Sequence, residues 1–394
     1  MARFIIITCS ILWLAASLYA NSDANTSTPQ QIHEELKAIR SLLEQQENKV
    51  NRLWRIAQPY LAELEAKADR EEKQQKEDVA LKMQELLRRK DVLFTSKLVF
   101  IPHSHTVMLA YSDNTIRFFD VNTAEDVNKS VHLDSSAKCL AVTADGATLF
   151  AGTDKGFVYA WKNGSDMCIK IADSNGWSVG SLAVSPDGAR LAWATNGGYR
   201  ANSQWEKPNE SCCVINLKNN KKLFGFSAGR SDFQGISFST DSRVLAFVKN
   251  GCVDLIDANT GEVIRSLEAE AYNCGPLSVV CGSTENLVAI GYAPYHIGLW
   301  NAATGMMTKL LQAHDNWVVS LCVSPDGTRL VSSAGDSTAS VWDIKSGTEI
   351  GRIRFGDGDS YVRSVSISSD GQLLAIGRSK EWVICRMPCV MPAQ

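Results

Sequence analysis

The chain repeats one short pattern of residues, and this repeat constrains its fold more than any other feature. Two copies are nearly identical: Leu182-Ala-Val-Ser-Pro-Asp-Gly-Ala-Arg-Leu191 and Leu321-Cys-Val-Ser-Pro-Asp-Gly-Thr-Arg-Leu330. Proline presets the first dihedral angle of such a turn, and glycine tolerates the conformation that ends it. Each copy therefore predicts a β-hairpin, and weaker copies have turns at residues 143–146, 239–242 and 368–371.

A third apolar stretch follows each hairpin and ends in a bulky residue, which Asp or Asn usually follows. These ends are Phe119-Asp120, Trp161-Lys162, Ile215-Asn216, Ile256-Asp257, Trp300-Asn301, Trp342-Asp343 and Cys385-Arg386. Successive ends are 42, 54, 41, 44, 42 and 43 residues apart. A period of about 40–45 residues with four short strands per repeat is typical of a β-propeller. We therefore expect an all-β, seven-bladed β-propeller over residues 92–394, because stacked blades bury both faces of each sheet.

The sixth repeat resembles the WD-repeat (G-beta-like) family. Its matching residues are Ala313-His314, Trp317-Val-Val319, Ser324-Pro-Asp-Gly327, Leu330-Val-Ser-Ser333, Asp336 and Val341-Trp-Asp343. The resemblance covers the chain from Leu98 to its C-terminus. It implies a structural hydrogen-bond network that satisfies buried polar groups, formed by His314, Ser332 or Ser333, Asp336 and Trp342. By analogy of fold, it also implies a propeller that binds other proteins.

The seventh blade needs an outermost strand from elsewhere in the chain. The candidates are Cys389–Met391, from the tail, and Val92–Thr95, which precedes the first blade. We expect the second, because joining the two ends of the propeller closes the ring without a free sheet edge.

The N-terminal residues 1–20 have the pattern of a signal peptide. Arg3 supplies a positive charge, the apolar run Phe4–Leu18 follows, and small residues such as Ala20 offer a cleavage site. The pattern predicts a secreted, periplasmic or lumenal protein. An uncleaved signal that anchors the chain to a membrane is the alternative.

A helical stalk is expected after a polar linker at residues 21–30. Residues 31–91 contain 26 charged residues among 61 and no glycine, and Pro59 interrupts the helical pattern. Heptads place apolar residues at coiled-coil core positions, namely Ile32, Leu36, Ile39, Leu43, Val50 and Leu53. Residues 31–58 could drive homo-oligomerisation. Packing of the two helices within one chain, or a single solvated helix, are the alternatives.

The balance of charge argues against a nucleic-acid partner. Lys and Arg number 40 and Asp and Glu number 43, so the formal net charge is −3, whereas a nucleic-acid binder normally has a concentrated basic excess. Six cysteines lie in apolar, strand-like runs and are expected to act as core residues: Cys139, Cys213, Cys252, Cys281, Cys322 and Cys385. The pairing of Cys212, Cys213, Cys385 and Cys389 stays open.

No pattern in the chain predicts a catalytic, cofactor-binding or metal site. Ser178 lies in a Gly-x-Ser-x-Gly match, but a strand and not a helix is expected after it. His103 and His105 have metal-like spacing without further ligands nearby. The Thr-Gly turns at 260–261 and 304–305 resemble those of quinone-dependent propeller dehydrogenases, the best enzymatic alternative, but the tryptophan that should follow is absent.

A partner surface is expected at the interval of 54 residues. The insert at residues 196–211 lies between the second and third strands of the third blade and contains Tyr199, Arg200 and Trp205. These residue types are enriched at interaction hot spots. Trp177 and Trp317 are expected on the same face, although a loop whose Trp205 packs on its own blade is the alternative. The sequence thus predicts an exported, non-catalytic WD-repeat scaffold, with a structural envelope component as a further alternative.

Overall fold

The structure is a computed structural model that describes most of the predicted propeller. The described residues are 84–90, 94–195, 198–199, 205–206, 210–227, 235–249, 252–267, 278–282, 287–292, 295–355, 361–379 and 381–388, together with Glu34 and Lys37. The predicted signal peptide and the predicted coiled-coil core residues Ile32, Leu36, Ile39, Leu43, Val50 and Leu53 lie outside this set. Self-association through residues 31–58 therefore stays a prediction. Among the described residues, no helix has the length and apolar character needed to cross a membrane.

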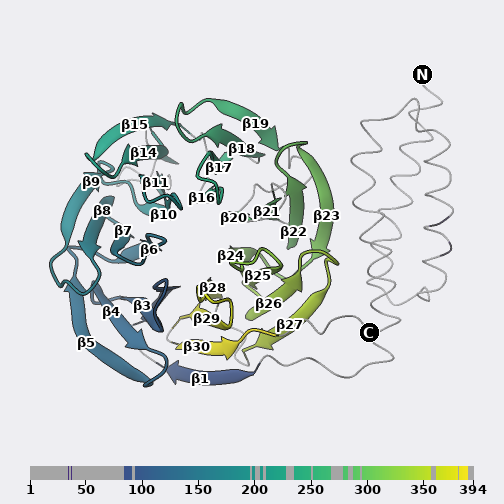
Figure 1. The fold of residues 1–394 in the computed structure, drawn as a ribbon, viewed down its shortest axis with the longest axis horizontal. Helices are drawn as coiled ribbons and strands as arrows, with labels where there is room; N and C mark the ends of the chain where they lie inside the picture. The colour runs from purple at the N-terminus through teal and green to yellow at the C-terminus, as the bar shows by residue number, and fades with distance from the viewer. Residues whose placement is uncertain are drawn as a thin grey trace. The chain divides into compact units, whose positions relative to one another are not determined.

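The chain forms seven four-stranded antiparallel sheets arranged as blades around a central axis (Figure 1). Blade 1 consists of β2 (Phe94–Phe100), β3 (Thr106–Tyr111), β4 (Thr115–Asp120) and β5 (Glu125–His132). Blade 2 consists of β6 (Ala137–Val142), β7 (Thr148–Thr153), β8 (Phe157–Lys162) and β9 (Ile169–Asp173). Blade 3 consists of β10 (Val179–Val184), β11 (Arg190–Thr195), β14 (Cys212–Asn216) and β15 (Lys221–Phe226).

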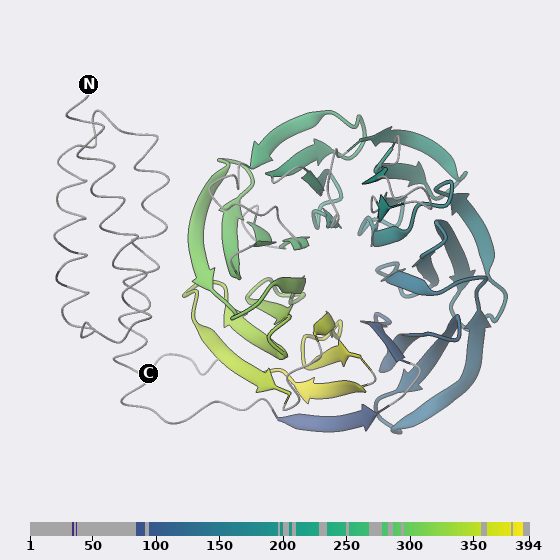
Figure 2. The same cartoon turned by 180° about the vertical axis from the view of Figure 1, so that it is seen from behind.

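The remaining blades follow the same order, with the first strand of each nearest the axis (Figure 2). Blade 4 consists of β16 (Ile236–Phe238), β17 (Val244–Lys249), β18 (Cys252–Asp257) and β19 (Val263–Leu267). Blade 5 consists of β20 (Ser278–Cys281), β21 (Leu287–Tyr292), β22 (His296–Asn301) and β23 (Met306–Gln312). Blade 6 consists of β24 (Val318–Val323), β25 (Arg329–Ala334), β26 (Thr338–Asp343) and β27 (Glu349–Arg354). Blade 7 consists of β28 (Val362–Ile367), β29 (Leu373–Arg378), β30 (Glu381–Arg386) and β1 (Glu85–Lys90).

The seven-bladed propeller is thus confirmed, and all seven predicted third-strand ends are strand ends in the structure. Side-chain hydrogen bonds explain why the turn residues recur. In blade 6, the Ser324 hydroxyl accepts a bond from the Arg329 amide at 3.0 Å and donates to Asp326, while Gly327 has φ +71°. Partial burial opposes the charge of Asp326, but the hydrogen bonds from Ser324 and Thr328 lower its pKa.

The apolar core lies between neighbouring blades. One buried cluster joins blades 5 and 6 through residues such as Leu299 and Trp342. Another joins blades 7 and 1 through residues such as Trp382 and Phe119, whose rings meet edge to face at 4.7 Å. Because each sheet buries its faces against the next blade, the fold depends on an unbroken ring.

The closing strand comes from the N-terminal side of blade 1, as expected, but its position corrects two predicted bounds. β1 pairs with β30 from Glu85 to Lys90, so in Figure 1 the blue β1 lies beside the yellow β30. Val92–Thr95 is not the closing strand, since Phe94 and Thr95 begin β2, and the predicted helical stalk cannot extend to residue 91. The free edge of β30 selects an extended conformation for Glu85–Lys90, because tertiary pairing overrides a weak local helix preference.

Serine hydroxyls fasten the same two blades near the axis. The Ser364 hydroxyl on β28 donates to the carbonyl of Leu98 on β2 at 3.1 Å, and the Leu98 amide lies 3.4 Å from the same oxygen. The Ser366 hydroxyl accepts a bond from the Phe100 amide at 3.0 Å. Blades 7 and 1 are therefore joined both at the inner strands and through β1 at the perimeter.

Charged side chains hold the closing strand. Glu381 at the start of β30 is bonded to Arg88 of β1 and to Arg378 of β29, the latter at 3.2 Å. Both guanidinium groups lie over the ring of Phe355, at 5.1 and 5.0 Å from its centroid. Near the surface, Arg89 of β1 forms two hydrogen bonds of 3.0 and 2.7 Å with Asp126 of blade 1.

The described cysteines are unpaired thiols within the blades. Cys139, Cys212 and Cys385 are buried, and Cys168, Cys213, Cys252, Cys281 and Cys322 are partly buried. Burial raises the pKa of Cys139 and Cys281 to about 12. Cys389 lies outside the described residues.

The buried Glu381 is expected to be essential for ring closure, and the exposed Asp126 is not. The Arg378 and Glu381 side chains are 3% and 8% exposed, so Glu381→Ala leaves a buried guanidinium without its carboxylate and should cost about 3–5 kcal/mol of unfolding free energy. Arg89 and Asp126 are 39% and 48% exposed, so Asp126→Ala should cost only about 0–1 kcal/mol. Urea unfolding of the full chain measures both. Equal losses would contradict this account of the closure.

Candidate functional site

The candidate site lies on one face of the propeller. Because neighbouring strands are antiparallel, each first strand begins on the face where the second strand ends and the third begins. We name this the upper face. It carries the segments leading into each first strand, including Trp177 before β10 and Trp317 before β24, and the turns between second and third strands.

Two exposed aromatic residues precede the first strands of blades 6 and 7 on the upper face. Trp317 and Tyr361 directly precede β24 and β28, and they are 44% and 39% exposed. The Gly335 amide donates to the Trp317 carbonyl at 2.9 Å. A Cβ at Gly335 would overlap the Tyr361 ring, so this position must be glycine for Tyr361 to rest there. Trp177, on blade 3, is partly buried.

The insert of blade 3 forms a small hairpin on the same face. Strands β12 (Gly198–Tyr199) and β13 (Trp205–Glu206) pair with Tyr199 opposite Trp205. They lie between β11 and β14, as the interval of 54 residues predicts. Arg200 lies outside the described residues. Whether Tyr199, Arg200 and Trp205 contact a partner stays a prediction.

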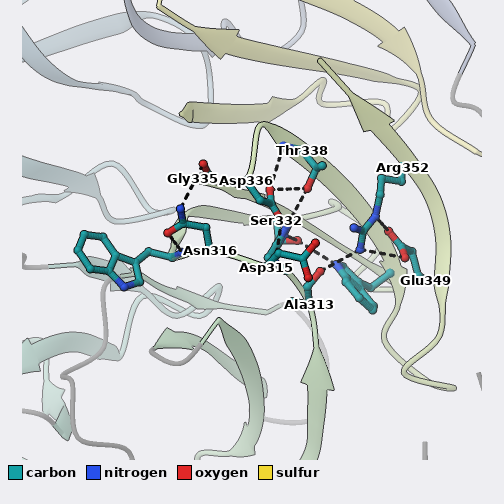
Figure 3. A network of polar contacts seen from close by, with 12 residues as sticks. Ala313, Asp315, Asn316, Ser332, Gly335, Asp336, Thr338, Glu349 and Arg352 are labelled. Carbon is teal, nitrogen blue, oxygen red and sulfur yellow. Dashed lines mark hydrogen bonds and ion pairs between the residues drawn. The ribbon is translucent and has the colours of Figure 1, made fainter. Parts of the chain in front are cut away.

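A polar network is buried at the upper edge of blade 6 (Figure 3). His314 Nε2 lies 2.8 Å from the Ser332 hydroxyl, which accepts a hydrogen bond of 2.9 Å from Trp342 Nε1. His314 Nδ1 lies 3.0 Å from Asp336 Oδ2 and 2.9 Å from the Thr338 hydroxyl. The structure thus brings together His314, Ser332, Asp336 and Trp342.

Asp336 is the charged centre of this network. Burial opposes its charge, but hydrogen bonds with His314 and Thr338 and from the Asp315 amide hold the pKa of Asp336 well below its usual range. The carboxylate therefore stabilises the folded blade in its charged form.

Ser333 stands outside the network, because its hydroxyl has no hydrogen-bond partner among the described residues. In their described residues, blades 2 and 5 lack the hydrogen bond from the third-strand tryptophan to a serine hydroxyl. The strand register places Ala151 and Ile290 where blade 6 has Ser332. Among the described residues, the indole nitrogens of Trp161 and Trp300 accordingly have no hydrogen-bond partner.

The sites weighed for catalysis fall on turns and strand edges. Ser178 directly precedes strand β10, and His103 and His105 lie in the turn between β2 and β3. No three His, Cys, Asp or Glu side chains gather as metal ligands in the part of the chain that the structure describes. Where quinone-dependent propellers place a docking tryptophan, Arg265 of blade 4 instead donates to the Ala303 carbonyl of blade 5 at 3.0 Å.

Sequence reasoning missed the neighbours of Trp317. Tyr361 occupies the position in blade 7 that Trp317 occupies in blade 6, and Arg363 lies beside it, with its guanidinium 5.9 Å from the Tyr361 ring centroid. Aligning Trp317-Val-Val-Ser320 with Tyr361-Val-Arg-Ser364 would have revealed this pair.

The comparison with protein families bears on the same blade. Residues 305–343 match the family described as "WD domain, G-beta repeat", a span that contains the whole network of His314. The chain is a seven-bladed β-propeller whose sixth blade matches the WD-repeat family.

Known relatives and structures agree with this fold. The chain is 30% identical over 119 residues to U3 small nucleolar RNA-associated protein 12 of Saccharomyces cerevisiae, covering 29% of this chain and 12% of that protein. It is 25% identical over 248 residues to nuclear distribution protein nudF of Aspergillus niger, covering 62% and 48%. A chain in the crystal structure of the mitotic checkpoint complex has a TM-score of 0.66 at 19% identity, with 79% of this chain and 94% of that chain covered.

These relatives contradict the predicted location. Their names refer to nucleolar RNA, to nuclear distribution and, for a Schizosaccharomyces pombe protein that is 22% identical, to meiosis. The prediction of a secreted, periplasmic or lumenal protein is therefore wrong on this comparison. The propeller spans from about an eighth to about half of the length of these relatives.

The buried indole of Trp342 is expected to contribute more stability than the imidazole of His314. Trp342→Ala removes a large, fully buried side chain and should cost about 3–5 kcal/mol of unfolding free energy. His314→Ala leaves polar partners unsatisfied and should cost about 1–3 kcal/mol. The matched control is Trp317→Ala, which removes an exposed indole and should change little. Thermal melts in which Trp342→Ala behaves like Trp317→Ala would show that the blade core is misassigned.

The contribution of Asp336 to stability is expected to vanish in acid. Since folding lowers the pKa of Asp336, its charge stabilises the fold above the ordinary aspartate value of about 3.9. This contribution is lost as the pH falls toward the folded value. Asp336→Asn should therefore be less stable than the natural chain at pH 7, and the difference should shrink below about pH 4. Urea unfolding at pH 7, 5 and 3 measures it, and a difference independent of pH would refute the assignment.

Proposed function

We propose that this chain is a non-catalytic platform that binds other proteins through the upper face of its propeller. The observation that carries the proposal is the placement of exposed Trp317 and Tyr361 on rigid strand starts of neighbouring blades. Trp and Tyr are enriched at interaction hot spots, where rigid aromatic anchors fill pockets of the partner. Exposed aromatic side chains bury little surface within the fold, so Trp317 and Tyr361 are better suited to contact a partner than to stabilise the blade.

The insert of blade 3 supports the same proposal. It adds a hairpin, β12–β13, which has no counterpart among the described residues of the other blades. A long loop with its own secondary structure on a rigid scaffold is commonly functional. Tyr199, Arg200 and Trp205 are therefore proposed as partner contacts.

The hydrogen bonds of His314 in blade 6 favour a structural role for this histidine over a catalytic one. Both ring nitrogens of His314 are engaged, with Ser332 on one side and with Asp336 and Thr338 on the other. A general base must reach a substrate proton, whereas this imidazole is buried among its own partners. A chain of similar fold was solved as part of a mitotic checkpoint complex, which is consistent with a propeller that works in assembly with other proteins.

Two sets of upper-face variants are expected to reduce partner capture. One combines Tyr199→Ala, Arg200→Ala and Trp205→Ala, and the other combines Trp317→Ala and Tyr361→Ala. Affinity capture of the tagged full chain from its native cells, followed by quantitative mass spectrometry, should show proteins that are lost from at least one set. The control combines Met167→Ala, Ile169→Ala and Val263→Ala, which remove exposed apolar side chains near the outer strands of blades 2 and 4.

The control set should capture the same proteins as the natural chain, and all variants should retain its melting temperature. If both upper-face sets capture the full complement of proteins while stably folded, the proposal is refuted. If the control set loses the partners instead, the binding surface is the perimeter.

A further inference from the structure

A line of contacts runs across the upper ends of the first strands from blade 6 to blade 1. Tyr361 packs on Gly335 of blade 6, and Arg363 lies over the Tyr361 ring. On blade 1, Lys97 Nζ donates to the Arg363 carbonyl at 3.3 Å. On blade 2, the exposed Lys138 lies near the start of the first strand, β6.

The two exposed cations of this line sit in matching β-bulges. The register shifts between Ala137 and Cys139 in blade 2 and between Val362 and Ser364 in blade 7, so Lys138 and Arg363 are the extra residues. A bulge re-aims the side chain that it carries, and both side chains are exposed.

The fold does not require charge at these bulges. The equivalent bulges of blades 3 and 6 carry Gly180 and Val319. Lys138 and Arg363 are therefore departures from the pattern that builds the blades, and they occur on either side of blade 1, which contributes Lys97 between them.

No described carboxylate pairs with the positive charges of this line. Among the described residues, Lys97, Lys138 and Arg363 form no ion pair with a carboxylate. Burial and the neighbouring charge of Arg363 lower the pKa of Lys97. The nearest upper-face carboxylates of blade 1 are engaged, Asp113 with Arg117 at 2.5 Å and Asp134 with the Tyr159 hydroxyl at 2.7 Å.

We propose that this aromatic–basic strip, formed by Trp317, Tyr361, Arg363, Lys97 and Lys138, binds an acidic peptide segment that carries an aromatic or aliphatic side chain. The exposed rings of Trp317 and Tyr361 receive the apolar side chain, and the exposed Lys138 and Arg363 receive carboxylates. This inference rests on the proposed function and specifies the chemistry of the partner.

The surroundings of the strip favour a peptide over single-stranded RNA. Aromatic and basic residues together can also bind nucleic acid, but a polynucleotide carries a charge at every residue. Its backbone would pass the carboxylates of Asp154 and Asp315, which are exposed on the neighbouring upper-face turns. A peptide can place its few carboxylates at the cations and leave neutral residues beside these aspartates.

Selection from a random peptide library tests the strip. A display library of 12-residue peptides is selected in parallel on the purified full chain, on Lys138→Val with Arg363→Val, and on a control. The valine variant is compatible with the fold because Val319 occupies the same bulge in blade 6. The control, Lys218→Gln with Lys221→Gln, removes two exposed positive charges, one from the turn after β14 and one from the first residue of β15.

The natural chain and the control should enrich acidic peptides that contain an aromatic or aliphatic residue. The valine variant should not enrich them and should bind a selected peptide roughly tenfold more weakly in fluorescence anisotropy, since bonds to charged groups are among the stronger ones. Trp317→Ala with Tyr361→Ala should weaken binding of the same peptide as well.

Several outcomes would overturn the inference. The selection could enrich neutral or basic peptides, or enrich none. The valine variant could bind the selected peptide as well as the natural chain does. Poly-uridine RNA could bind the strip in place of acidic peptides. If the full chain captures proteins from its native cells through the upper face but one of these outcomes is found, the strip is refuted while the proposed function stands.

Discussion

The need of every blade for two neighbours is the constraint on which the rest of the structure depends. The buried clusters are shared between adjacent blades, so a blade without a neighbour would expose an apolar face to water. The ring must therefore close, and it closes by pairing β1 with β30. Serine hydroxyls on β28 hold the inner strands of the same junction, and Glu381 holds the outer ones. Because closure fixes each blade against the next, the loops of the upper face are displayed in a constant arrangement.

Residues that recur from blade to blade build the fold, and positions where one blade departs from the others suggest the function. The hydrogen-bond network centred on His314 is complete in blade 6, where the chain matches the WD-repeat family. Elsewhere the blades replace Ser332 by apolar residues and rely on packing. At the upper face the pattern breaks in a different way, since Lys138 and Arg363 occupy bulges that are filled by Gly180 and Val319 in other blades. Positions where the fold accepts different residue types, such as these bulges, can carry side chains that bind a partner.

Local patterns predicted most of the fold, because each hairpin is specified by residues close in sequence. The ends of the third strands and the bounds of the insert follow from turn residues and spacing alone. The closing strand was misplaced because Glu85–Lys90 is compatible with a helix until the distant edge of β30 is considered. The aromatic–basic strip was missed for the same reason: Lys97 and Arg363 are 266 residues apart and meet through closure of the ring. The predicted location was wrong because a short apolar run was interpreted without reference to the folded domain.

Closure by β1 has a consequence for how the protein is made. Arg88 and its partner Glu381 are separated by 293 residues, so the first strand of the closing pair leaves the ribosome long before the second. At a synthesis rate of about 5–20 residues per second, β1 waits roughly 15–60 s for its partner. Throughout this time its backbone donors and acceptors, and the open edge of each finished blade, are available to other nascent chains. The strand edges of this protein are therefore most open to pairing with other chains before the final blade is synthesised.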